Sequence, residues 1–119
     1  MVATVAFAGS GIAVAHSASL ARQPTPAERA AIIRALPPDV QRIPIGCVWL
    51  AVTVSNNGRY ARVVPQDLNA GSRTCAKYSG NGYWIMKKLA RWKTVFLGSV
   101  DPPCSLHIPR DLQPCSKHS

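Results

Sequence analysis

Four widely spaced cysteines constrain the fold of this chain more than any other feature of its sequence: Cys47, Cys75, Cys104 and Cys115. An even number of separated cysteines in a small chain is typical of disulfides, whereas a zinc site normally includes a close pair of ligands. We therefore expect two disulfides and no metal site. Of the three pairings that four cysteines allow, we favour Cys47–Cys75 with Cys104–Cys115, because each closes a loop between neighbouring segments.

The first 20 residues contain no Lys, Arg, Asp or Glu and are built largely from small and apolar residues. This composition fits the apolar region and cleavage zone of a secretory signal. A transmembrane anchor is the alternative, but the uninterrupted apolar part is shorter than the roughly 20 residues that a membrane span needs. We predict a signal peptide over residues 1–21 and a secreted protein. At 119 residues in all, the chain has room for one small domain, over residues 22–119, and we expect a monomer.

A helix is predicted to begin after Thr25, because Thr25 can cap it, Pro26 suits its first position and Glu28 can complete a capping box. Two consecutive prolines at 37 and 38 should end this helix. Its buried face is expected to contain the apolar residues Ala27, Ala30, Ala31, Ile33 and Leu36.

Residues 43–54 are rich in β-branched residues and predict a strand whose even positions from Val48 to Val54 form one apolar face. Asn57 and Gly58 follow as a strong signal for a tight hairpin turn. A second strand is expected over residues 59–64, with Pro65 at its end, and residues 67–82 have the composition of a loop.

Residues 82–99 fit two structures. On a helical wheel, most of their apolar residues share one side and most of their cations the other, which favours an amphipathic helix. However, both ends are rich in aromatic and β-branched residues, around Trp84 and from Trp92 to Leu97, with a polar middle that can form a turn. We favour the hairpin. We also expect Trp49, Trp84 and Trp92 to lie in the core, because the domain has few large apolar residues.

The last 20 residues contain four prolines, which exclude a long regular element. Residues 109–112 suit a single turn, and we expect Cys104 and Cys115 to hold this tail against the domain. The predicted fold is therefore α+β: one N-terminal helix followed by a four-stranded antiparallel sheet, with two disulfides and a proline-rich, disulfide-held C-terminal tail.

This set of features resembles small exported proteins of high-GC Gram-positive bacteria. The resemblance rests on the Thr25-Pro26-x-Glu28 helix start, the strand from Gly58 to Val63, the Trp92 strand that ends at Gly98, and Cys104 followed by residues 108–112, Ile-Pro-Arg-Asp-Leu. It implies an exported α+β domain and no catalytic residues. The element order is also similar to cystatin-like folds, but the inhibitory Gln-x-Val-x-Gly loop of the cystatins is absent, so the resemblance does not imply inhibition.

The residues of common catalytic sites are sparse. The sequence has no Gly-x-Ser-x-Gly motif, and Ser105, His107 and Asp111 lie in the proline-rich tail, where a solvated loop is the simpler interpretation. A ribonuclease-like site would use His107 and His118 with nearby cations, but His118 is next to the last residue. We predict a non-catalytic protein without a cofactor and keep a small ribonuclease-like enzyme as the second alternative.

Positive charge is the remaining functional signal. The chain carries a net charge of +9, and one stretch between Asp67 and Asp101 contains only basic charges: Arg73, Lys77, Lys87, Lys88, Arg91 and Lys93. Such a surface favours an anionic partner, here a cell-wall polymer, an anionic lipid surface or extracellular nucleic acid. Two other interpretations stay open: these side chains only solvate the outer face of a sheet, or the protein is a secreted protein-binding module, such as a hydrolase inhibitor, that presents a disulfide-held loop.

Overall fold

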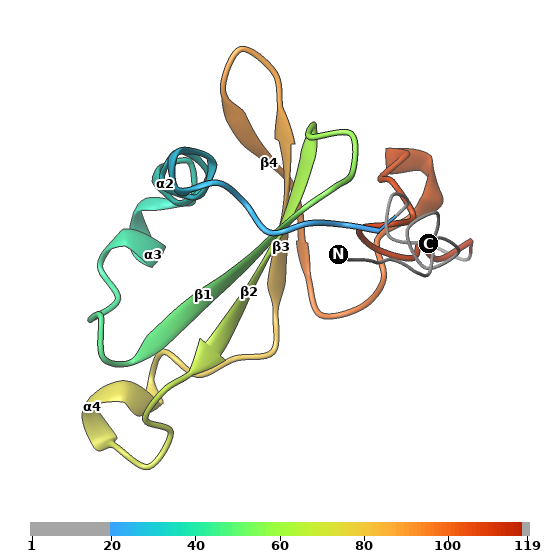
Figure 1. The fold of residues 1–119 in the computed structure, drawn as a ribbon. Helices are drawn as coiled ribbons and strands as arrows, with labels where there is room; N and C mark the ends of the chain where they lie inside the picture. The colour runs from blue at the N-terminus through green and yellow to red at the C-terminus, as the bar shows by residue number, and fades with distance from the viewer. Residues whose placement is uncertain (1–19, 118–119) are drawn as a thin grey trace, which may run out of the picture.

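The computed structural model describes residues 20–117, so most of the predicted signal peptide lies outside the described residues. The fold is mixed α/β, with one antiparallel sheet of four strands in the order β1-β2-β3-β4. A helical segment lies on one side of this sheet and the C-terminal tail on the other (Figure 1). The strands are β1 (Val48–Val54), β2 (Tyr60–Asp67), β3 (Tyr83–Lys88) and β4 (Trp92–Gly98).

The predicted helix is α2 (Pro26–Arg34), and its start is as expected. The Thr25 side chain accepts from the Glu28 N–H at 3.1 Å, and the Glu28 carboxylate accepts from the Thr25 N–H at 2.9 Å. This reciprocal capping box satisfies two backbone donors that a helix start otherwise leaves unpaired. It therefore fixes where the chain enters the domain.

The expectation of a single helix is incomplete. Among the described residues, α2 is accompanied by two four-residue helices, α3 (Pro38–Gln41) and α4 (Arg73–Ala76). Helical structure resumes at Pro38 after α2 has ended. Pro38 occupies the first turn of α3, where its missing N–H costs no hydrogen bond. The α4 turn lies inside the segment predicted as a loop and carries Cys75. Within the described part, no helix is long and apolar enough to cross a membrane.

The first hairpin has the predicted turn but different strand ends. Gly58 has a φ of +75°, a conformation that glycine adopts at little cost. β1 begins only at Val48, and β2 continues through Pro65, which we predicted would end it. The Leu68 N–H donates to the Cys47 carbonyl at 3.0 Å. Because neighbouring N–H groups of a strand point in opposite directions, the even-numbered residues of β2 direct their N–H groups at β1. The nitrogen of Pro65 therefore faces the β3 side, where pairing stops at Val63, so no sheet hydrogen bond is lost.

Residues 82–99 form a hairpin and not a surface helix, as we favoured. β3 and β4 pair antiparallel, with Lys88 opposite Trp92 at the closed end and Tyr83 opposite Gly98 at the open end. The register shifts beside Ile85, which leaves Val95 as the extra residue of a β-bulge. The hairpin extends the same sheet because β3 also pairs with β2.

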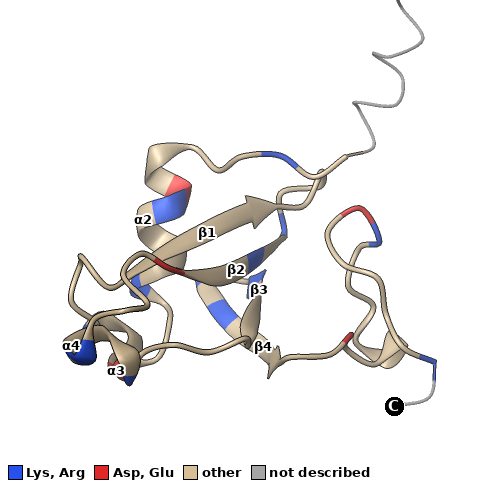
Figure 2. Ribbon diagram, turned by 90° about the horizontal axis from the view of Figure 1, so that it is seen from below, with Lys and Arg blue, Asp and Glu red and all other residues tan. Residues whose placement is uncertain are grey.

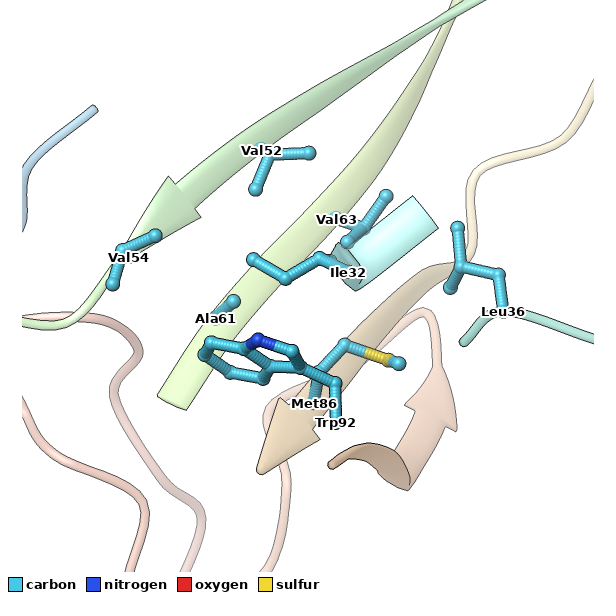
Figure 3. Packing of buried hydrophobic residues seen from close by; sticks show 8 residues of the cluster. All are labelled: Ile32, Leu36, Val52, Val54, Ala61, Val63, Met86 and Trp92. Atoms are coloured by element: carbon cyan, nitrogen blue, oxygen red, sulfur yellow. The ribbon is translucent and has the colours of Figure 1, made fainter. Parts of the chain in front are cut away.

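The main core lies between the sheet and the helical segment. We call this side of the sheet the helix face. Ile32 points from α2 into the sheet and is fully buried, with Trp92 only 5% exposed beside it (Figure 3). Ala27 and Ala30, which we expected on the buried face of the helix, are exposed. The buried cluster contains Ile32, Leu36, Val52, Val54, Ala61, Val63, Met86 and Trp92.

A second core lies on the opposite side of the sheet, which we call the tail face. Ile108 and Leu112 of the C-terminal tail are buried against Tyr60 and Ile85, and residues 109–112 form the expected turn. The Arg62 guanidinium donates to Gln113 at 2.9 Å, and the Gln113 amide donates to Asp101 at 3.0 Å. Packing and hydrogen bonds therefore hold the tail on the sheet.

Both predicted disulfides are present, Cys47–Cys75 and Cys104–Cys115. The first ties α4 to the start of β1. The second joins two residues of the tail and closes the tail on itself. It does not link the tail to the sheet, although we had expected it to hold the tail against the domain. Two disulfides indicate an oxidising environment, such as the outside of a cell.

Candidate functional site

The closed end of the β3–β4 hairpin gathers four of the six predicted basic residues. Lys87 pairs with Lys93 across the two strands, on the tail face. Lys88 ends β3 on the helix face, and Arg91 lies in the connecting turn. Because neighbouring side chains in a strand point to opposite faces, these four cations surround the end of the hairpin. Lys88, Arg91 and Lys93 are exposed, and Lys87 is half-buried.

Arg59 belongs to the same surface, although we did not predict it from the sequence. It lies in the turn between β1 and β2, and its carbonyl accepts from the Lys88 N–H at 2.7 Å. The ends of the two hairpins are therefore adjacent, as Figure 1 also shows. Only the register of β2 against β3 brings Arg59 here. We call the set Arg59, Lys87, Lys88, Arg91 and Lys93 the cationic hairpin end.

One acid, Glu28, lines an open hollow of about 450 Å³ together with Arg59 and Lys88 of the cationic hairpin end. Its two carboxylate oxygens accept from the Arg22 guanidinium at 2.8 and 2.9 Å. Hydrogen bonds from Arg22, and then from the Thr25 backbone, lower the pKa of Glu28 to about 2. The negative charge of Glu28 is therefore already paired.

The cations of the hairpin end have no acidic partner within residues 20–117. The two ion pairs in this part of the chain are Arg22–Glu28 and Arg42–Asp39. The Lys87 ammonium instead lies 5.5 Å from the centroid of the Tyr60 ring, a cation–π geometry that leaves its charge uncompensated. Five cations without an ion-pair partner at the ends of two adjacent hairpins form a local positive field that can attract an anion.

Arg73 and Lys77 do not join this surface. Both lie in or just after α4, which precedes the start of β3, whereas the cationic hairpin end lies at the other end of β3. Figure 1 shows α4 and the β3–β4 turn at opposite ends of the sheet. Figure 2 shows the Lys and Arg positions spread over both regions. The predicted six-residue basic surface is thus divided into two parts.

The structure does not assemble the catalytic groups that the sequence raised. The Asp111 carboxylate accepts from the backbone N–H of Asn56 at 2.7 Å. None of the hydrogen bonds within residues 20–117 joins Asp111 to His107 or Ser105. His118 lies outside the described residues. In the described part, no cluster of three or more His, Cys, Asp or Glu side chains has the geometry to hold a metal ion.

Comparisons with protein families, with curated proteins and with solved structures gave no match. The resemblance to exported proteins of high-GC Gram-positive bacteria therefore stays a prediction.

Proposed function

We propose that this protein is a small exported, non-catalytic domain that binds an anionic polymer or surface through the cationic hairpin end. The observation that carries the proposal is the grouping of Arg59 with Lys87, Lys88, Arg91 and Lys93 at the ends of two adjacent hairpins, with no ion-pair partner within residues 20–117. A polymer with one negative charge per repeat can contact several of these cations together, and each contact releases counterions.

Two features of the fold support this proposal. The cations lie at the end of a paired hairpin, so the charged surface is held by sheet hydrogen bonds and by the buried Trp92. The two cores cover the centre of the sheet on both faces, which leaves the hairpin end as a free, charged part of the molecule.

The test compares two charge-reversal variants of the secreted protein. Lys88→Glu with Arg91→Glu changes the cationic hairpin end, and Arg73→Glu with Lys77→Glu makes the same change in net charge at the opposite end of the sheet. All four side chains are exposed, so both variants should keep nearly the same stability. Binding to duplex DNA, to wall teichoic acid and to vesicles containing phosphatidylglycerol is measured over a series of salt concentrations.

We expect the hairpin-end variant to bind more weakly than the wild type to each of these polyanions that the wild type binds. On duplex DNA, its slope of log affinity against log salt should be shallower by about 2, because each lost phosphate contact removes about 0.9. The α4 variant should keep most of the affinity. Equal losses in the two variants would mean that net charge alone is responsible, and no binding by the wild type would refute the proposal.

The alternatives predict other outcomes of the same work. A salt-tolerant complex with one protein would favour the secreted protein-binding module. RNA cleavage that is lost in His107→Ala would favour the ribonuclease-like enzyme.

A further inference from the structure

A second surface, away from the cationic hairpin end, combines an apolar groove with one cation. The groove is open, has a volume of about 250 Å³ and lies between the helical segment and β1. Ile45 is 94% exposed and Trp49 is 49% exposed, although the sequence suggested that every tryptophan would lie in the core. The apolar lining is formed by Ile33, Val40, Ile43, Ile45, Val48, Trp49 and Leu50.

Arg29 is the charged residue that lines this groove. It comes from α2, and its guanidinium carbon lies 4.0 Å from the centroid of the Trp49 ring. Its Nη1 donates to the Leu50 carbonyl at 2.7 Å. These two contacts fix the guanidinium plane at the groove wall. Neither ion pair of residues 20–117 includes Arg29, so its charge is available to a ligand.

The other polar side chain of the groove lining is already engaged. The amide nitrogen of Gln41 donates to the carbonyls of Ile33 and Leu36. Arg29 is therefore the one cation beside an otherwise apolar lining. Charge complementarity with Arg29 and apolar contact with the other side chains both match a ligand with one anionic head and an apolar tail.

We propose that this groove binds a carboxylate with a hydrocarbon tail. The carboxylate would accept hydrogen bonds from the free Nε and Nη2 of Arg29, and the tail would lie against Ile33, Val40 and Ile45. The groove volume of about 250 Å³ is just below the range of about 300–1,000 Å³ that encloses a whole drug-sized ligand. It fits the head and the first part of a chain, with the remainder lying over exposed Ile45.

The test is a titration of the full secreted protein with dodecanoate, kept below its micelle-forming concentration and followed by calorimetry. We expect one site per protein. Arg29→Gln should weaken binding by about tenfold or more, because a hydrogen bond to a charged group contributes at least that much. Ile45→Ser should weaken it by about threefold, since only part of the side chain would be covered by the tail. The high exposure of Ile45 means that this variant should fold normally.

Matched controls are available on the same fold. Arg34→Gln removes a cation from the last turn of α2, where the side chain is exposed and outside the groove. Val100→Ser removes an apolar side chain that is 70% exposed elsewhere. Both variants should bind dodecanoate like the wild type.

Three results would overturn the proposal. Dodecanol binding as tightly as dodecanoate would exclude a role for the Arg29 charge. Unchanged binding in both Arg29→Gln and Ile45→Ser would exclude the groove. Loss of binding in Lys88→Glu with Arg91→Glu, but not in Arg29→Gln, would place the ligand at the cationic hairpin end.

Discussion

Replacing Trp92 by alanine should destabilise the whole domain. Its side chain is 5% exposed and belongs to the buried cluster that joins β4 to Ile32 of α2. Truncation of a buried tryptophan costs about 3–5 kcal/mol, from the lost burial and from the cavity that remains. Domains of this size have a net stability of only about 5–15 kcal/mol. The variant should therefore lose a large fraction of its free energy of unfolding.

Thermal unfolding, followed by far-ultraviolet circular dichroism with the disulfides intact, measures this loss. At about 4–8 °C for each kcal/mol in a domain of this size, Trp92→Ala should lower the Tm by at least about 12 °C. Trp49→Ala is the matched control, because Trp49 is 49% exposed and its contact with Arg29 contributes only about 0.5–1 kcal/mol. Its Tm should fall much less.

The comparison also tests the hairpin. If residues 82–99 formed an amphipathic helix on the protein surface, Trp92 would be exposed and both variants would melt alike. Equal Tm values for Trp92→Ala and Trp49→Ala would therefore refute the core that we describe. The intermediate variant Trp92→Phe should melt between the wild type and Trp92→Ala, because it retains part of the buried volume.

Three further predictions concern stability. Intact mass should show two disulfides, and free thiols in the exported protein would contradict this prediction. From the loop lengths, the bridge across 28 residues should contribute about 3.6 kcal/mol to stability and the bridge across 11 residues about 2.8 kcal/mol. The pKa of Glu28 is lowered from 4.5 to about 2, so the contribution of its charge to the free energy of unfolding should be complete above pH 4.5 and be lost as the pH falls towards 2. In Glu28→Gln, the loss of stability over this pH range should be smaller by about 1 kcal/mol, as measured by urea unfolding. Gly58→Ala should cost about 1–2 kcal/mol because φ is +75° there, whereas Gly46→Ala, with open space around it, should be neutral in the same assay.

Local signals predicted the local structure well. The capping box at Thr25, the turn at Gly58 and the strand-like ends of residues 82–99 each depend on residues close in sequence, and each is present. The buried side of α2 was harder to predict. Alanine is apolar and small, so a helix rich in alanine has no sharply defined apolar stripe. The position of α2 on the sheet buries Ile32 completely and leaves Ile33 only partly buried, and this position depends on tertiary packing.

The candidate site depended on structure that the sequence did not reveal. A run of basic residues appears continuous in the sequence, but β3 separates it. At about 3.3 Å per residue, the six residues of this strand span roughly 17 Å, and α4 precedes the start of the strand whereas the hairpin turn follows its end. Arg59 enters the site for the converse reason: it is distant in sequence, and strand register brings it to Lys88. Charge counts along a chain therefore define a surface only once the strand pairing is known.

One signal in β3 explains why the free surfaces lie where they do. Residues 83–86 are Tyr, Trp, Ile and Met, so apolar side chains occur on both faces of the strand without polar alternation. A strand of this kind needs cover on both sides. With α2 over Met86, the tail is the segment left to cover Ile85. Both faces at the centre of the sheet are then occupied, and a ligand can approach only the periphery. The cationic hairpin end and the groove beside β1 both lie at the periphery, and each offers positive charge without an ion-pair partner. The hairpin end has several cations, which suits a polymer. The groove has one cation beside apolar side chains, which suits an amphipathic molecule.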